Sequence, residues 1–235
     1  MDRFYHAALQ SESQRINLSV SESQHLVKVL RKKIGSQVEI INGKGGIATA
    51  EIQSLDPKGC GLWVYNYKQL PPASYSLHIA IAPTKSNDRF EWFLEKATEI
   101  GVQHITPLLC TNSERRKINL ERWQRIILSA TKQSKQLYKP LLNPLTPFPK
   151  FINQHTEMLI AHCHDKPKKE LHTIPFSTNP CCILIGPEGD FTQEEIDQAL
   201  NRGAQAIQLG SNRLRTETAG MVATHTWRLL ADIAP

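Results

Sequence analysis

The first part of the chain alternates short apolar segments with turn residues. Three strands and one helix are expected, at residues 38–41, 47–52, 60–67 and 21–31. Asn42-Gly43-Lys44-Gly45-Gly46 joins the first two strands, and an Asn-Gly turn between alternating segments is typical of a β-hairpin. Ser21 is a suitable N-cap for the helix. These elements predict a small β-barrel-like domain over residues 1–71, and Pro71-Pro72 marks its end.

From Tyr75 onward the pattern changes to alternating strands and helices. Strands are expected at residues 77–81, 104–109, 158–162, 181–185 and 206–209, and helices at residues 88–100, 119–137, 192–200 and 216–231. Thr192-Gln193-Glu194-Glu195 is a capping box that opens the third helix. Apolar strands that alternate with helices predict a mostly parallel sheet covered on both faces. The predicted fold class is therefore α/β, with a second domain over residues 72–235.

The composition is that of an ordinary globular protein. Hydrophobic residues make up 40% and charged residues 21%, and no apolar run is long enough to span a membrane. The first ten residues, MDRFYHAALQ, contain charges and no apolar signal core, so we do not expect secretion. The five cysteines form no regularly spaced framework, which favours free thiols in the reducing cytoplasm.

Positive charge is concentrated in two places. Residues 113–139 contain eight basic and two acidic residues, and Lys28, Arg31, Lys32 and Lys33 form a second cluster. Concentrated positive charge attracts a polyphosphate backbone through counterion release. A solvated helix face has the same composition, so the charge alone leaves both readings open.

Two loops that contain glycine follow predicted strands, where open α/β sheets bind their ligands. The first loop is residues 185–191, and its glycines let the backbone approach a ligand closely. The second loop is residues 209–219, which brings two arginines, a carboxylate and two hydroxyls to the start of a helix. Both could instead be tight strand-to-helix turns. Neither matches the dinucleotide fingerprint or the phosphate-binding loop, which argues against a dehydrogenase or an ATPase.

Taken as strings, four segments resemble the knotted SPOUT methyltransferases. They are LIGPEGDFTQEEI from Leu184, LGSNRLRTETAG from Leu209, HLVKVLRKKIG from His25 and EKATEIGVQHITPL from Glu95. Within that superfamily the chain is most similar to the RsmE-type enzymes, which methylate N3 of a uridine in 16S ribosomal RNA. The resemblance covers nearly the whole chain, and all four segments stand in register.

The resemblance implies a fold, a cofactor and a partner. It implies a PUA-like RNA-binding domain at the N-terminus and a C-terminal α/β domain with a deep trefoil knot, which sequence physics alone would not predict. It also implies S-adenosylmethionine as cofactor, no metal, 16S ribosomal RNA or the small subunit as partner, and a homodimer with the active site near the subunit interface. The implied cofactor-binding residues are Ile185, Gly186, Pro187, Glu188, Gly189, Leu209, Gly210, Leu214, Arg215 and Thr216.

Methyl transfer to N3 of uracil needs alignment, stabilisation of negative charge on a carbonyl oxygen, and a proton acceptor. Arg215 is the candidate stabilising cation, because a guanidinium stays charged and presents a fork of donors. Glu217 is the candidate base, and it could equally cap the last helix or pair with an arginine. The candidates for holding RNA are Arg3, His25, Lys28 and Arg31. Their alternative is a basic surface without a ligand.

The chain departs from the family pattern at two places. Lys132-Gln133-Ser134-Lys135-Gln136 stands where a Gln-Ser or Gln-Cys pair is usually followed by Gly-Arg, so one RNA or substrate contact is in doubt. Asp190 stands where glycine is common.

Other functions remain as alternatives. His162-Cys163-His164-Asp165 with Cys181-Cys182 suggests a zinc site, but the paired Cys-x-x-Cys spacing is missing and we predict no metal. A related SPOUT enzyme that acts on transfer RNA and a non-catalytic RNA-binding protein are the two main rivals. The intact glycine loops favour an enzyme.

Overall fold

The computed structural model describes residues 1–234, which form two compact units. The N-terminal unit comprises Met1–Pro72 together with Thr131–Lys139, and the remaining residues form the C-terminal unit. The later segment joins the first unit through backbone hydrogen bonds, from Gly45 N to Leu137 O at 3.0 Å and from Lys139 N to Gly43 O at 2.9 Å. The sequence pattern placed one boundary at residue 71, and it gave no sign of this return of the chain.

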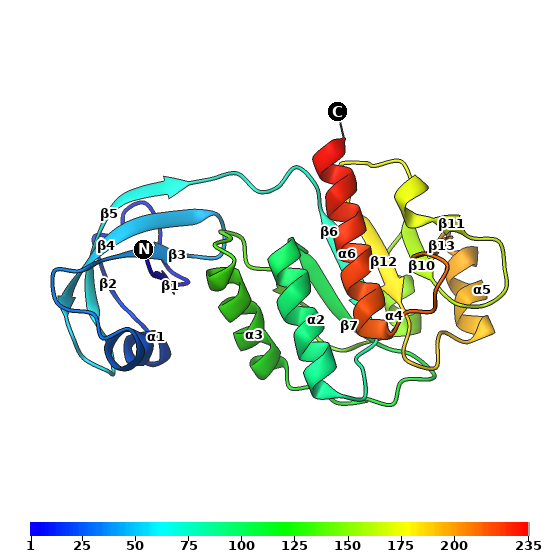
Figure 1. Cartoon of the computed structure of the whole chain (residues 1–235), viewed down its shortest axis with the longest axis horizontal. Coiled ribbons are helices and arrows are strands. Elements are labelled where there is room, and N and C mark those ends of the chain that lie inside the picture. The colour runs from blue at the N-terminus through cyan, green and yellow to red at the C-terminus, as the bar shows by residue number, and fades with distance from the viewer. Residues whose placement is uncertain (235) are drawn as a thin grey trace. The chain divides into compact units, whose positions relative to one another are not determined.

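A curled five-stranded sheet forms the N-terminal unit (Figure 1). Its order is β1-β3-β4-β5-β2, with β1 Arg3–Tyr5, β2 Arg15–Asn17, β3 Gln37–Ile41, β4 Gly46–Ser54 and β5 Gly61–Gln69. The predicted strands are confirmed as β3, β4 and β5, which pair antiparallel. Alternate residues of β4, such as Ala48, Ala50 and Ile52, point into the core. The two three-residue strands were not predicted, because a strand so short shows no period.

The predicted N-terminal helix has a different start and a different geometry. Helix α1 spans Val20–Gln24, and its N-cap is Ser19, whose hydroxyl accepts from Glu22 N. The prediction of Ser21 as N-cap is therefore wrong. The chain continues as a π-helix, η1, over His25–Val29, where Leu30 N donates to His25 O. Sequence periodicity near 3.6 residues does not separate this turn from an α-helix.

The C-terminal unit contains an eight-stranded sheet, with the order β11-β13-β10-β12-β6-β7-β8 and β9 paired beside β7. Its strands are β6 Leu77–Ile81, β7 His104–Leu109, β8 Leu141–Leu142, β9 Thr146–Pro147, β10 Met158–Ala161, β11 Lys169–Glu170, β12 Cys181–Ile185 and β13 Gln205–Gln208. Within residues 1–234, each strand pair of this sheet is parallel, which confirms the predicted α/β fold.

The helices are α2 Asn87–Ile100, α3 Leu120–Gln133, α4 Phe148–Ile152, α5 Gln193–Asn201 and α6 Thr216–Ile233, with a short 3-10 turn, η2, at Leu171–Thr173. The capping box at Thr192 is confirmed, since its side chain accepts from Glu195 N. Helix α3 ends four residues earlier than predicted, because Lys135 adopts the left-handed conformation at φ 59°. Helix α4 and the two-residue strands were not predicted.

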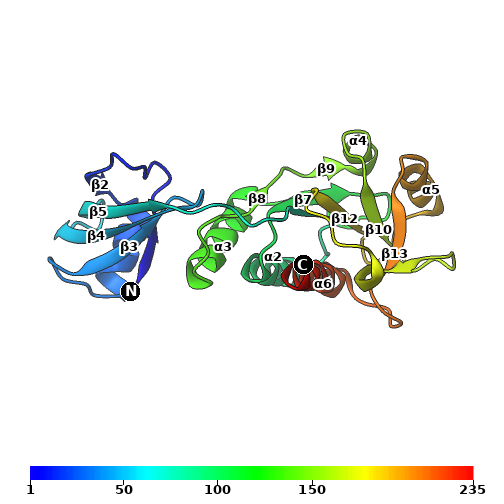
Figure 2. The same cartoon turned by 90° about the horizontal axis from the view of Figure 1, so that it is seen from above.

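Two hydrophobic cores lie on opposite faces of the C-terminal sheet. Ile183 packs with side chains of α2, α3 and α6, whereas the next residue, Leu184, packs with side chains of α4 and α5. Figure 2 shows α2 and α6 on one side of the strands and α4 and α5 on the other. The sheet is thus buried on both faces, as its apolar strands predict. In the part of the chain that the structure describes, no helix is long and apolar enough to cross a bilayer.

Strand order determines where the loops meet. Strand β10 lies between β12 and β13, and all three run in the same direction. The loops that follow them therefore leave from the same edge of the sheet, the edge where open α/β sheets bind ligands.

Candidate active site

Three loops enclose a cavity of about 610 Å³ at this edge. They follow β10, β12 and β13, and the first turn of α6 completes the wall. The lining residues include the following predicted cofactor residues: Ile185, Gly186, Pro187, Glu188, Leu209, Gly210, Leu214, Arg215 and Thr216. The remaining one, Gly189, lies outside the lining, and its carbonyl accepts from Asn112 Nδ2 at 3.2 Å.

The loop after β12 is fixed by its own backbone and by neighbouring loops. Asp190 N donates to Pro187 O at 2.9 Å, and Glu188 Oε1 accepts from Lys85 N at 2.8 Å. A Cβ on Gly186 would lie 3.1 Å from the buried ring of Phe191, so a larger residue here would require that ring to shift. The loop therefore presents a preformed wall to the cavity.

The loop after β13 carries the positive charge of the site. Gly210 has φ 114°, which favours glycine, and Thr216 Oγ1 donates to Gly186 O at 3.1 Å, joining the two loops. Arg215 is the N-cap residue of α6, and its exposed side chain lines the cavity. Within residues 1–234, no ion pair holds its guanidinium. Arg215 is therefore available to a ligand.

Glu217 lies in the same helical turn but does not line the cavity. Its side chain is 9% exposed, Oε1 is 3.8 Å from Arg89 Nε on α2, and Oε2 has no partner among the described residues. A carboxylate in the first turn also interacts favourably with the helix dipole. This position favours the ion-pair reading of Glu217, and no observation places the carboxylate beside a reacting atom.

The third loop was not predicted as part of the site. Ala161, His162, Cys163 and Lys168 line the cavity, yet the sequence reading considered only a metal role for His162 and Cys163. Within residues 1–234, no group of three or more metal-ligating side chains could hold an ion. The available signal was the end of a predicted strand at residue 162, which a parallel sheet brings to the same edge as the two glycine loops.

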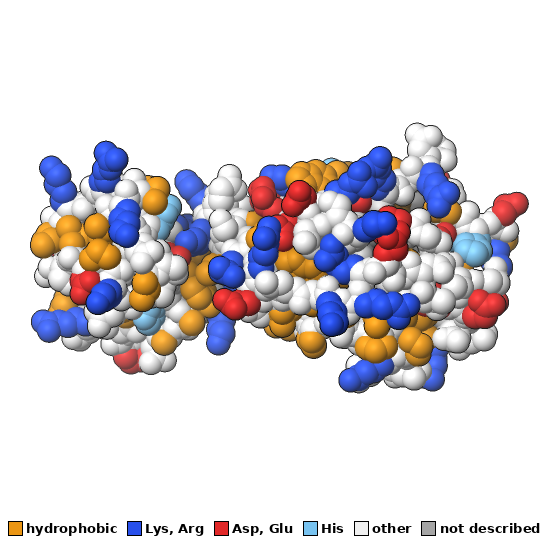
Figure 3. Space-filling view, turned by 90° about the horizontal axis from the view of Figure 1, so that it is seen from below, with side chains coloured by type: hydrophobic (Ala, Val, Ile, Leu, Met, Phe, Trp, Pro, Cys, Tyr) orange, Lys and Arg blue, Asp and Glu red, His pale blue; other side chains and the backbone are white. Residues whose placement is uncertain are grey.

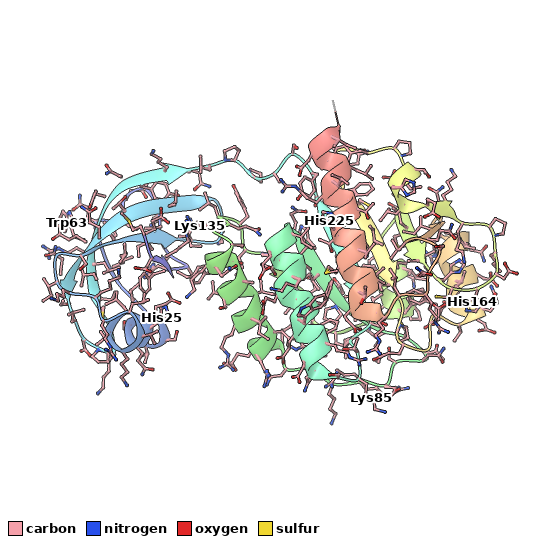
Figure 4. The ribbon with its side chains drawn as sticks, in the orientation of Figure 1. His25, Trp63, Lys85, Lys135, His164 and His225 are labelled. Atoms are coloured by element: carbon pink, nitrogen blue, oxygen red, sulfur yellow. The ribbon has the colours of Figure 1, made fainter. Side chains whose placement is uncertain are left out.

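The candidate RNA-binding residues differ in accessibility. The Arg3 side chain is 10% exposed and pairs with Glu39 at 2.9 Å. His25, Lys28 and Arg31 are exposed, on or just after η1, and Figure 4 labels His25 in this region. On the face seen in Figure 3, Lys and Arg side chains are spread over both units and do not form one patch.

Comparisons with known proteins identify the family. An RNA methyltransferase domain model matches residues 71–228, and an RNA methyltransferase PUA domain model matches residues 18–60. The chain belongs to this RNA methyltransferase family. The second match supports a PUA-like domain in the N-terminal part of the chain, and the first identifies the chain as an RNA methyltransferase.

Relatives of this methyltransferase span its whole length. The ribosomal RNA small subunit methyltransferase E of Rickettsia conorii is 30% identical over 98% of this chain and 96% of its own. A crystal structure of a probable rRNA-methyltransferase from Porphyromonas gingivalis is 34% identical, with a TM-score of 0.89 over 97% and 99% of the chains. The methyltransferase E of Neisseria gonorrhoeae, bound to S-adenosyl methionine, is 28% identical, with a TM-score of 0.85 over 98% of each chain. The RsmE-type resemblance of the sequence is confirmed.

Proposed function

We propose that this methyltransferase uses S-adenosylmethionine to methylate N3 of a uridine in 16S ribosomal RNA, within the small ribosomal subunit. The observation that carries the proposal is the cavity at the carboxyl edge of the sheet, which is bounded by the two glycine loops and lined by an unpaired arginine. The relatives named for small-subunit ribosomal RNA align over nearly the full chain, including the N-terminal unit.

The cavity fits this cofactor by size and by the distribution of polarity. Some of its lining residues are buried and mostly apolar, such as Ile185, Pro187 and Ile207, and suit a purine nucleoside. Other lining residues, Glu188, Arg213 and Arg215, are charged and exposed, and suit a zwitterionic amino acid. His162 adds a buried ring without a hydrogen-bond partner in the described chain.

S-adenosylmethionine, when bound, supplies a methyl group on a sulfonium sulfur. Arg215 then acts on the base: its guanidinium donates hydrogen bonds to a uracil carbonyl oxygen, where negative charge develops as N3 loses its proton. Pre-organised donors of this kind typically contribute about 100- to 1000-fold in rate. Glu217 forms an ion pair with Arg89, and we propose that this contact fixes the N-terminus of α6. The proton from N3 is then accepted by water or by the RNA.

We propose a trefoil knot for the segment that carries these loops. Its support is the path of the chain: after β13, helix α6 returns across the sheet to contact β12, β6 and α2. Thr216, at the start of that return, hydrogen-bonds the loop after β12. This threading accounts for two distant loops forming one cavity wall.

The N-terminal unit is proposed as the RNA-holding domain, and the enzyme as a homodimer in the cytoplasm. The exposed His25, Lys28 and Arg31 supply donors and charge for a phosphate backbone. The side chain of Arg3 is committed to Glu39, so we propose a structural contribution for it in place of direct RNA contact. The cysteines of the chain are free thiols, which fits a reducing compartment.

The test is methyl transfer from labelled S-adenosylmethionine to small ribosomal subunits that lack the native modification, followed by nucleoside analysis. Label in 3-methyluridine is expected. Cofactor binding without transfer to subunits, but with transfer to transfer RNA, would favour the rival SPOUT activity. RNA binding without any cofactor binding would favour the non-catalytic rival.

A further inference from the structure

The loop after β10 lines the cavity because its strand lies between the two strands that carry the glycine loops. Residues at its start, His162 and Cys163, line the cavity together with Lys168 at its end. The position of this loop follows from the order of the parallel strands and does not depend on its side chains. The chemistry of His162, Cys163 and Lys168 decides what the loop can bind.

His162 is buried without a hydrogen-bond partner. Its residue exposure is 6%, and neither Nδ1 nor Nε2 has a partner in the part of the chain that the structure describes. Buried polar groups in proteins are nearly always hydrogen-bonded, so such a ring calls for an explanation. Burial lowers the pKa of His162, and the nearby Lys168 lowers it further, while Asp190 acts in the opposite direction. A neutral ring offers one donor and one acceptor.

The loop around His162 is held rigidly. Lys168 Nζ donates to His162 O at 3.2 Å and to His164 O at 2.6 Å, which closes the loop on itself. Asp190 Oδ2 accepts from Cys163 N at 2.7 Å, and the ring of His164 donates to Phe191 O at 2.9 Å, which joins the loop to the wall after β12. Figure 4 labels His164 in this region. The lack of a hydrogen-bond partner for the His162 ring therefore occurs in a loop that is anchored at several points.

Asp190 has a specific part in this arrangement. It adopts the left-handed conformation at φ 63°, and its Oδ1 accepts from Phe191 N at 2.8 Å. The second carboxylate oxygen is then free to bind the backbone of the loop after β10. The Asp190 carboxylate thus links the loop after β12 to the loop after β10.

We propose that His162 binds the nucleoside part of the cofactor through a ring nitrogen, and that Asp190 is the residue that positions this ring. The inference rests on the proposed use of S-adenosylmethionine. The nucleoside is favoured over the amino-acid part because His162 is buried, whereas the charged lining residues Glu188, Arg213 and Arg215 are exposed. An uncharged hydroxyl or purine nitrogen suits a buried, uncharged partner better than a zwitterion does.

The test measures binding of S-adenosylhomocysteine and of 5′-methylthioadenosine, which lacks the amino-acid part, by calorimetry on the full chain. His162→Phe should weaken both by roughly tenfold, the usual effect of one lost hydrogen bond to an uncharged group. The same variant should raise the Tm of the cofactor-free protein, because it removes an unpartnered buried polar group. His162→Gln, which keeps a donor and an acceptor, should retain more affinity. Asp190→Asn should weaken both ligands in the same ratio, by less than His162→Phe.

A matched control is His172→Phe, since His172 is exposed on η2 and does not line the cavity. Unchanged affinity of His162→Phe for both ligands would overturn the inference while the proposed function stands. A loss confined to S-adenosylhomocysteine would overturn the nucleoside assignment. Failure of the wild-type chain to bind S-adenosylhomocysteine would instead count against the proposed function. If His162→Phe does not fold, His162→Ala, which also removes both ring nitrogens, takes its place, and unchanged affinity of that variant for both ligands would likewise overturn the inference.

Discussion

Histidines lie at both ends of the C-terminal sheet, partly buried at the amino end and buried at the carboxyl end, and the two sets differ in their partners. At the amino end, the His78 ring nitrogen is 2.7 Å from Thr106 Oγ1, and His155 Nδ1 donates to Phe151 O at 2.9 Å. His78 also packs in edge contact with Phe151 and His155. At the carboxyl end, His162 has neither ring nitrogen satisfied within residues 1–234. The satisfied rings at the amino end stabilise the fold, whereas the partner proposed for the His162 ring is the cofactor.

The difference teaches that residue type is a poor guide to function in this sheet. Burial lowers the pKa of both His78 and His162. The first is enclosed by strands and α4, while the second faces a cavity. Changes at the carboxyl end should therefore affect ligand binding and rate, and changes at the amino end should affect stability and its pH dependence.

The largest effect is expected at Arg215. Arg215→Ala should lower the rate of methyl transfer by about 100-fold or more, because it removes the donor that stabilises charge on the base. Affinity for S-adenosylhomocysteine should fall by less than about tenfold, because this ligand lacks the uracil on which the charge develops and loses only the contact of Arg215 with its amino-acid part. Single-turnover transfer and calorimetry measure the two quantities. Near-normal transfer in this variant would remove Arg215 from the mechanism.

A stability effect is expected where α6 packs on α2. A Cβ at Gly220 would lie 2.6 Å from the ring of Phe93 and 2.8 Å from Ile81 Cδ1, both of which are buried. Gly220→Ala should lower the free energy of unfolding by about 1–2 kcal/mol, because overpacking outweighs the gain in helix propensity. Urea unfolding measures the effect. The exposed His225→Ala on the same helix should stay within about 0.5 kcal/mol of wild type.

His78 gives the pH prediction. Burial and the neighbouring His104 and His155 lower the pKa of His78 from 6.5 to about 3 in the folded protein. Between these values the unfolded chain binds a proton that the folded chain does not, so stability falls as the pH falls, by up to about 1.4 kcal/mol per pH unit. His78→Asn should flatten the dependence of unfolding free energy on pH between about 6.5 and 3. The affinity of His78→Asn for the cofactor at neutral pH should equal that of the wild type. A marked loss of affinity would contradict the assignment of ligand binding to the carboxyl end of the sheet alone.

The smallest effect is expected at the exposed basic residues of the N-terminal unit. Lys28→Gln should weaken RNA binding by a few-fold and make the dependence of affinity on salt shallower by about one in slope, as for one lost phosphate contact. Arg3→Gln should instead lower the stability of this unit, because it leaves Glu39 without its partner. Filter binding over a salt series separates a lost phosphate contact, which makes the salt dependence shallower, from a loss of stability, which does not. Equal salt slopes for wild type and Lys28→Gln would exclude the phosphate contact.

Much of the fold was predictable because local patterns agree with it. The β12 run from Cys181 to Ile185 is apolar throughout, as a strand buried on both faces must be. The capping box at Thr192 fixed the start of α5. By contrast, the π-helix at His25–Val29 and the return of residues 131–139 to the N-terminal unit left no local signal. The first depends on a single extra residue in one turn, and the second on contacts between residues about ninety positions apart.

The sequence by itself determined the α/β class, the family and the two glycine loops, since strings such as Gly186-Pro187-Glu188-Gly189 constrain backbone geometry directly. Only the tertiary structure decided which other residues join them. Strand order placed β10 between β12 and β13, and so brought His162, Cys163 and Lys168 into the cavity. Helix packing set Glu217 on α6 against Arg89 on α2, and the pairing of β1 with β3 set Arg3 against Glu39. The physical reason is that side-chain partners depend on long-range strand order and helix packing, which no short segment of the chain encodes.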